Sequence, residues 1–197
     1  MGLKGYFIQY KFILPEGIKH SSYTYQKLFR ALYGYTQNVT KSNGKAYKYH
    51  RDGVLSKTPY LRPGKNCVII PHAAFNQLIS FFKTGKNPSH YWRGKGDWKA
   101  VYYMDEKDLN ESDVVAALEG QLDRTYITNS SDTPQQLSGA LDIILTRAKE
   151  TQKVDAAYLN ATMSDAEKIV AGQWFKDTYK KSPKLTSFYQ KYKQIKA

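Results

Sequence analysis

Hydrophobic side chains in the first half of the chain change their spacing from one segment to the next. Residues 5–14, GYFIQYKFIL, carry an aromatic or aliphatic side chain at every second position, which predicts a β-strand with one buried face. Residues 21–35 carry apolar side chains at i, i+3, i+4 and i+7, which predicts a helix that ends at Gly34. A strand followed by a helix is therefore the first expectation for this chain.

The same two spacings continue to residue 106. The turn dipeptide Asn43-Gly44 precedes a predicted strand, a β-branched strand and a second helix follow, and a last strand ends the series. These segments are residues 45–51, 68–70, 72–85 and 98–106. The order β-α-β-β-α-β predicts a ferredoxin-like sandwich, in which two helices cover one face of a four-stranded antiparallel sheet and leave the other face open.

The rest of the chain has the signals of helices. Helices are predicted from residue 110 to 126, from Thr133-Pro134 to about residue 149, from a capping box at Ser164, and after Ser182-Pro183. We therefore expect an α+β protein with a ferredoxin-like βαββαβ domain over residues 1–106. A helical C-terminal region over residues 107–197 follows it.

Charge is distributed unevenly over these regions. The chain has a net charge of +13. Residues 1–104 hold 17 Lys and Arg against 3 Asp and Glu, residues 105–163 hold 5 against 11, and residues 164–197 hold 8 against 3. A basic excess of this size favours a polyanionic partner over a small neutral substrate, and it places the binding surface in the N-terminal block.

The chain has a single cysteine, Cys67, so it has neither an intrachain disulfide nor a C-x-x-C zinc motif. It shows no signal-peptide pattern and no uncharged apolar run long enough to cross a membrane. A cytoplasmic protein without a membrane partner is expected. Because the chain also lacks a G-x-G-x-x-G motif and a P-loop, and its four histidines have no metal-ligand spacing, we predict no cofactor and no metal.

Aromatic and basic residues alternate in two segments, YKYHR (residues 47–51) and SHYWRGKGDWK (residues 89–99), and a basic loop with two prolines covers residues 56–66. This composition is typical of surfaces that stack unpaired bases and contact phosphates. We therefore predict a nucleic-acid-binding protein, with RNA or single strands favoured, that is a component of a nucleoprotein complex and contacts other proteins through its helical region. The predicted binding residues are Tyr47, Lys48, Tyr49, Arg51, Arg62, Lys65, Tyr91, Trp92, Arg93, Lys95 and Lys99.

Two alternatives remain open on the sequence. A small metal-dependent nuclease would use Asp52 or Asp97 with His50 or His90. A scaffold protein would bind an acidic partner protein through the basic block. Of the two neighbouring tyrosines on the last strand, residues 102 and 103, at least one is expected in the hydrophobic core.

Overall fold

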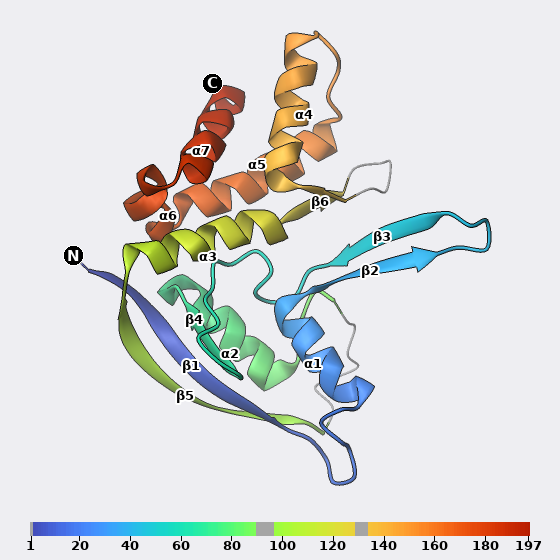
Figure 1. Ribbon diagram of the computed structural model, residues 1–197, viewed down its shortest axis with the longest axis vertical. Coiled ribbons are helices and arrows are strands. Elements are labelled where there is room, and N and C mark those ends of the chain that lie inside the picture. Colours follow the sequence, from blue (N-terminus) through green and yellow to red (C-terminus); the bar gives the residue numbers. More distant parts are fainter. Residues whose placement is uncertain (1, 90–96, 129–133) are drawn as a thin grey trace. The chain divides into compact units, whose positions relative to one another are not determined.

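The computed structural model describes residues 2–89, 97–128 and 134–197 (Figure 1). It divides into two compact units. The first comprises Met1–Thr36 and His50–Asn110, and the second comprises Gln37–Tyr49 and Glu111–Ala197. The structure is a mixture of helices and small antiparallel sheets, as the α+β prediction requires.

A three-stranded antiparallel sheet forms the centre of the first unit. Strand β1 (Leu3–Ile13) lies between β4 (Cys67–Ile70) and β5 (Lys99–Leu109). Alternate residues of β1 face the helices α1 (Tyr23–Tyr33) and α2 (Phe75–Thr84), which follows the short helix η1 (His72–Ala74). The buried side chains of this core include Ile8, Tyr10 and Phe12 of β1, Leu28 and Leu32 of α1, and Leu78, Phe81 and Phe82 of α2.

The four-stranded ferredoxin-like sheet is not confirmed. The segment predicted as its second strand, β3 (Ala46–Arg51), pairs instead with β2 (Tyr35–Thr40) in a separate two-stranded sheet. The tight turn at Asn43-Gly44 gives β3 a partner strand immediately before it in the sequence, and local pairing needs little loop-closure entropy. The other predicted strands and both helices of this block are found.

The segment that leaves β3 covers the end of helix α1. The carbonyls of Ala31, Leu32 and Tyr33 accept hydrogen bonds from the Val54 N–H, the Leu55 N–H and the Ser56 hydroxyl. The N–H of Gly34, a residue with a φ of 76°, donates a hydrogen bond to the carbonyl of Arg30. Without these partners the last carbonyls of α1 would be buried without hydrogen bonds. Because the segment that supplies the partners follows β3 directly, it also fixes the base of the hairpin to α1.

Two glycines make this close approach possible. A side chain at Gly53 would place its Cβ 2.7 Å from the Tyr33 carbonyl carbon and 2.8 Å from that of Leu32. A Cβ at Gly34 would lie 2.7 Å from the Arg51 carbonyl oxygen. Both contacts are with backbone atoms, which cannot rotate away, so the two positions require glycine.

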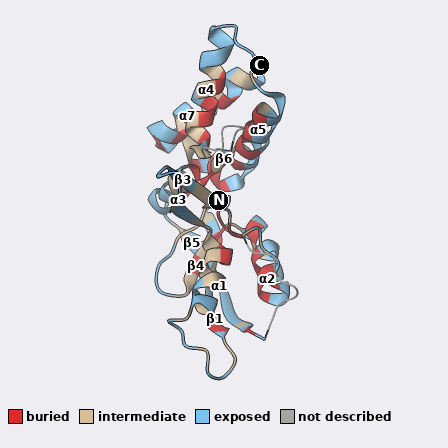
Figure 2. Ribbon diagram, turned by 90° about the vertical axis from the view of Figure 1, so that its right-hand side faces the viewer, coloured by how far each residue is buried: buried red, intermediate tan, exposed pale blue. Residues whose placement is uncertain are grey.

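The second unit is mostly helical, apart from its part of the β2–β3 hairpin and a short hairpin of β6 (Tyr126–Thr128) and β7 (Pro134–Gln136). Its helices are α3 (Glu111–Arg124), α4 (Leu137–Lys149), α5 (Ala156–Ala171), α6 (Gln173–Thr178), η2 (Tyr179–Lys181) and α7 (Pro183–Lys196). Figure 2 shows that buried and exposed residues alternate along these helices, so each of the α-helices has a buried side. None of the helices in the described residues is long and apolar enough to cross a membrane.

Two of the predicted helix starts are wrong. Pro134 belongs to strand β7, and α4 begins after it at Leu137. Ser164 lies inside α5, which begins at Ala156 because the Asp155 side chain accepts a hydrogen bond from the Tyr158 N–H at 2.8 Å. The start after Ser182 is confirmed, since its hydroxyl accepts a hydrogen bond from the N–H of the third residue beyond it.

Candidate nucleic-acid interface

The predicted binding residues lie in three places in the structure. Tyr47, Lys48, Tyr49 and Arg51 are on β3, Arg62 and Lys65 precede β4, and Lys99 begins β5. Tyr91, Trp92, Arg93 and Lys95 lie outside the described residues. The hairpin therefore brings together the largest group of candidates.

Tyr47 and Tyr49 share one face of the hairpin because side chains two residues apart on a strand point to the same side. Their rings are nearly parallel, with 6.5 Å between centroids and 25° between planes. The ammonium group of Lys41 lies 4.3 Å from the centroid of the Tyr47 ring. Both tyrosines are half-buried, so the face combines accessible ring surface with an adjacent cation.

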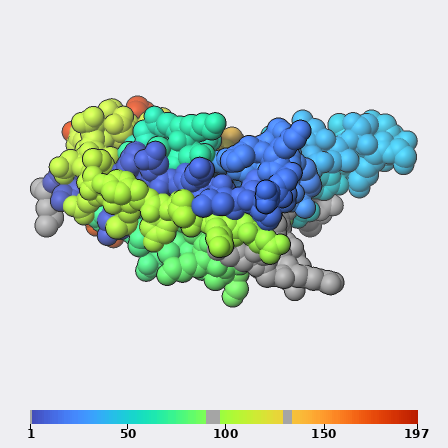
Figure 3. All heavy atoms as spheres, turned by 90° about the horizontal axis from the view of Figure 1, so that it is seen from below, coloured from blue at the N-terminus to red at the C-terminus, as the bar shows by residue number. Residues whose placement is uncertain are grey.

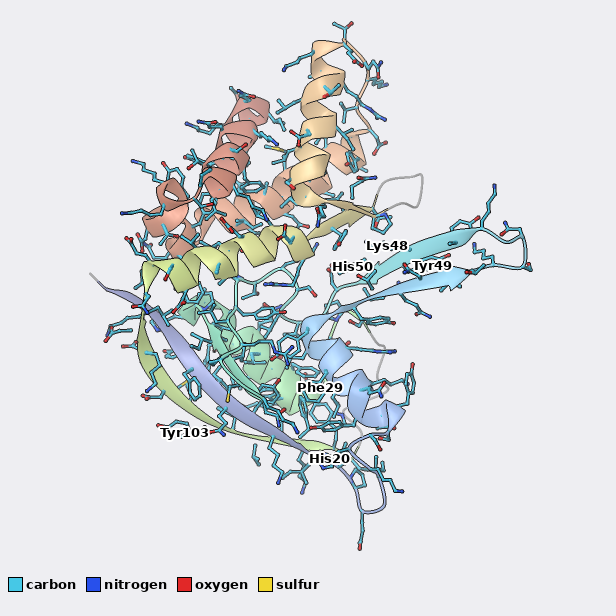
Figure 4. The ribbon with its side chains drawn as sticks, in the orientation of Figure 1. His20, Phe29, Lys48, Tyr49, His50 and Tyr103 are labelled. Carbon is cyan, nitrogen blue, oxygen red and sulfur yellow. The ribbon has the colours of Figure 1, made fainter. Side chains whose placement is uncertain are left out.

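Lys48 and His50 point to the other face of β3, and Figure 4 shows Lys48, Tyr49 and His50 as successive side chains. The Lys48 ammonium group lies 5.4 Å from the centroid of the Tyr126 ring on β6. His50 Nδ1 lies 3.2 Å from Thr36 Oγ1, across the hairpin. The two faces thus differ, since the Lys48 face is tied to other parts of the fold and the Tyr47 face carries the paired rings.

The cations of the hairpin have no negatively charged partner within the part of the chain that the structure describes. Residues 35–51 contain no Asp or Glu. In the described ranges, no ion pair involves Lys41, Lys45, Lys48 or Arg51. Of the other described Lys and Arg residues up to residue 104, Lys4 and Lys57 form ion pairs, with Glu106 and Asp52. The four hairpin cations are therefore not neutralised by ion pairs within the described residues, and Asp52, which follows Arg51 in the sequence, contacts His50 and Lys57 instead.

Arg62 has a different environment from the hairpin cations. Its guanidinium carbon lies 4.5 Å from the centroid of the Tyr33 ring, and the Tyr33 hydroxyl is 2.9 Å from that of Tyr10. Burial raises the pKa of both tyrosine hydroxyls, so they stay neutral at physiological pH. Arg62 therefore covers the rim of the aromatic core, while Lys65 is exposed in the turn before β4.

Lys99 lies on the face of the three-stranded sheet that points away from the helices. On this face it pairs with Ile13, and the next two cross-strand pairs are Lys11 with Val101 and Gln9 with Tyr103. Figure 3 shows β1 and β5 side by side on this surface. Tyr103 is 61% exposed, and its side chain points away from the protein in Figure 4. Lys11 and Tyr103 were not among the predicted binding residues, although the alternation of polar and apolar residues in β1 places Lys11 on the outer face.

The prediction that residue 102 or 103 is in the core is wrong. Tyr102 faces the helices and touches Phe82, with 5.8 Å between ring centroids, but it is 42% exposed. Strand β5 is at the edge of the sheet, with β1 as its neighbour, so even its inward side chains keep one side in water. Trp98, just before this strand, is 3% exposed and packs against Phe12 and Phe81.

Of the residues predicted for a nuclease, His50 and Asp52 lie close together. His50 Nε2 lies 3.1 Å from Asp52 Oδ1, and Lys57 Nζ lies 3.5 Å from Asp52 Oδ2. Burial acts to raise the pKa of Asp52, but the hydrogen bond with His50 and the charge of Lys57 outweigh it and lower that pKa. Both ring nitrogens of His50 thus contact protein groups, Thr36 and Asp52, which joins the two strands of the hairpin to the loop that follows.

A metal site has no support within the described ranges. They contain no group of three or more His, Cys, Asp and Glu side chains that is placed to hold a metal ion. Asp97 is exposed, and His90 lies outside the described residues. A hard divalent cation needs several oxygen ligands, and the contact between His50 and Asp52 supplies a single carboxylate.

Comparisons of the chain with protein-family models, with curated proteins and with solved structures found no match. The function must therefore be inferred from the residues and their arrangement.

Proposed function

We propose that the protein binds nucleic acid, with RNA or single strands favoured over duplex DNA, as a non-catalytic component of a nucleoprotein complex. The main contact is the hairpin of β2 and β3. The observation that carries the proposal is the parallel pair of rings of Tyr47 and Tyr49, with Lys41 beside the Tyr47 ring, on a hairpin whose four cations form no ion pair within the described residues. Lys65 and Lys99 of the first unit add positive charge.

The chemistry of single strands fits this surface. Unpaired bases expose their faces and stack on tyrosine rings, whereas the bases of a duplex are already stacked on one another. Cations without a carboxylate partner gain most from contact with a phosphate, because no existing ion pair has to be broken. Binding of this kind releases counterions, so the affinity depends steeply on salt concentration.

The test is the salt dependence of binding to oligouridylate RNA, measured by fluorescence anisotropy. Replacing Lys48 and Arg51 together by alanine removes two phosphate contacts. We expect the slope of log K against log salt concentration to fall by about 1.4, since each contact to a single strand contributes about 0.7. A duplex of the same length serves for comparison and should bind more weakly than the RNA.

A matched control removes the same charge elsewhere. Lys184 and Lys191 form ion pairs with Asp123 and Asp142, both at 2.7 Å. Their double replacement by alanine should leave the slope unchanged. Binding that is absent, that does not depend on salt, or that responds equally to both double variants would contradict the proposal.

The contact between His50 and Asp52 favours one second candidate, the small nuclease. A nuclease would cleave labelled RNA or DNA, and this cleavage would need a divalent cation and disappear in the variant Asp52→Asn. The binding measurement separates the two, because a binding protein leaves the oligonucleotide intact over the same incubation.

A further inference from the structure

The second unit contains a groove that the sequence did not reveal. It has a volume of about 510 Å³ and lies between α5, α6, η2 and α7. Its lining combines aromatic rings and lysines: Phe175, Tyr179, Tyr189, Tyr192, Lys176, Lys193 and Lys196. The lining is therefore suited to a planar group that carries negative charge.

The aromatic rings of the groove are held in place by one another. Tyr179 stacks on the buried ring of Phe175, with 5.4 Å between centroids and 6° between planes. Tyr189 meets Tyr179 edge-on at 4.8 Å and lies nearly parallel to the buried Tyr192 at 6.4 Å. Tyr179 and Tyr189 are half-buried. Rings fixed in this way lose little conformational entropy when a ligand stacks on them.

Cations stand over the two half-buried rings. Lys193 Nζ lies 4.9 Å from the centroid of Tyr189, and Lys180 Nζ lies 5.9 Å from that of Tyr179. In the described residues, Lys176, Lys180 and Lys193 form no ion pair. These long side chains keep their charge available for a phosphate beside a stacked base.

The carboxylate of the groove is neutralised within the protein. Glu167 Oε1 accepts a hydrogen bond from Lys196 Nζ at 2.8 Å and one from the Tyr192 hydroxyl at 3.4 Å. The bond from Lys196 lowers the pKa of Glu167, so this carboxylate stays ionised and paired at physiological pH. Repulsion of a phosphate by Glu167 is therefore small, and the groove as a whole favours an anion.

We infer that this groove is a second binding site for single-stranded nucleic acid, in which a base stacks on Tyr189 or Tyr179 and the flanking phosphates contact Lys176, Lys180 and Lys193. The inference extends the proposed function to a second surface. It adds the basic C-terminal segment to the binding surface, although that segment also neutralises the acidic helices.

The experiment measures the affinity of the full chain for oligouridylate RNA. Tyr189→Ala should weaken binding about five- to hundredfold, and Tyr189→Phe, which keeps the ring, should bind like the original protein. Because Tyr189 packs against other rings, thermal unfolding checks that Tyr189→Ala is folded. The double variant Lys176→Ala with Lys193→Ala changes exposed side chains and should weaken binding without affecting folding.

Crosslinking then locates the RNA. Oligouridylate that contains 4-thiouridine is irradiated with the protein, and the crosslinked peptides are identified by mass spectrometry. Crosslinks within residues 173–197 support the groove. Suppose that the hairpin variants weaken binding, the groove variants bind like the original protein and no crosslink falls within residues 173–197. The inferred binding site in the groove is then wrong, and the proposed function stands. If only the groove variants weaken binding, the groove is confirmed as a binding site and the hairpin is not the main contact. If neither set of variants weakens binding, both the proposed function and the inferred groove site are wrong.

Discussion

The lysines of the hairpin and those of the C-terminal helices have the same charge but different surroundings. Lys41, Lys45 and Lys48 lie in a segment without carboxylates and contact tyrosine rings or solvent. Four lysines of the C-terminal segment instead face acidic residues of α3, α4 and α5. These pairs are Lys181 with Glu111 at 3.5 Å, Lys184 with Asp123 at 2.7 Å, Lys191 with Asp142 at 2.7 Å and Lys196 with Glu167 at 2.8 Å.

The difference between these two groups of lysines shows that the number of charges in a segment does not locate a binding surface. Three of these pairs join the acidic middle block to the basic tail of the sequence, so part of the charge of both blocks is neutralised within the second unit. The scaffold alternative relies on the basic block of residues 1–104, and none of these four pairs involves that block. What remains available to a polyanion is the set of cations without carboxylate partners.

The largest expected effect comes from breaking the base of the hairpin. In Gly53→Ala the new Cβ meets backbone carbons of Leu32 and Tyr33 at 2.8 and 2.7 Å, so the hairpin cannot keep its junction with α1. We expect the first unit to lose about 3 kcal/mol or more of its free energy of unfolding. Urea unfolding followed by tryptophan fluorescence and by circular dichroism measures the loss.

Gly64→Ala is the matched control for this change. A Cβ at Gly64 meets nothing within 4 Å, and this position is in the same unit. The control should change the free energy of unfolding by less than about 0.5 kcal/mol. Equal stability of both variants would show that the segment after β3 does not approach α1 as closely as described.

The next effect concerns the rings of the hairpin. Tyr49→Ala removes one of the two parallel rings and should weaken binding to oligouridylate by about 1–3 kcal/mol, the range for one stacked base. Anisotropy titrations at constant salt measure this loss. Tyr49→Phe keeps the stacking surface and should bind almost as tightly as the original protein. If the two variants bind alike, the hairpin contributes charge alone.

Much of the first unit followed from periodicity. The alternating residues of β1, the helical stripes of α1 and α2, and their ends at Gly34 and Gly85 are where the sequence places them. The partner of β3 could not be predicted in this way. Residues 35–40, YTQNVT, have no alternation of apolar side chains, so their role as a strand depends on pairing with β3 rather than on a hydrophobic face.

The candidate site was predictable only in part, for two physical reasons. Composition identified the cations and aromatic rings of β3, because these are local in the sequence. The groove depends on Tyr179 and Tyr189, which are brought together by the docking of η2 against α7. The capping motif at Ser164 failed because helix-start signals are weak compared with tertiary packing: Ala166 and Ile169 are buried beyond Ser164, inside the continuous helix α5.

The smallest effect is expected where the lysines are paired. The Lys184–Asp123 pair is short, but the two side chains are 41% and 54% exposed, so water screens their attraction. Lys184→Ala should therefore lower the free energy of unfolding by only about 0.2–1 kcal/mol, and less at high salt. A double-mutant cycle with Asp123→Ala, measured by urea unfolding at two salt concentrations, isolates the coupling between the two residues. A coupling above about 2 kcal/mol that salt does not reduce would mean that the tail lysines hold the helices together. In that case the paired lysines are structural cations, and the unpaired lysines are the cations available for binding. The affinity for RNA should be unchanged in Lys184→Ala under either result.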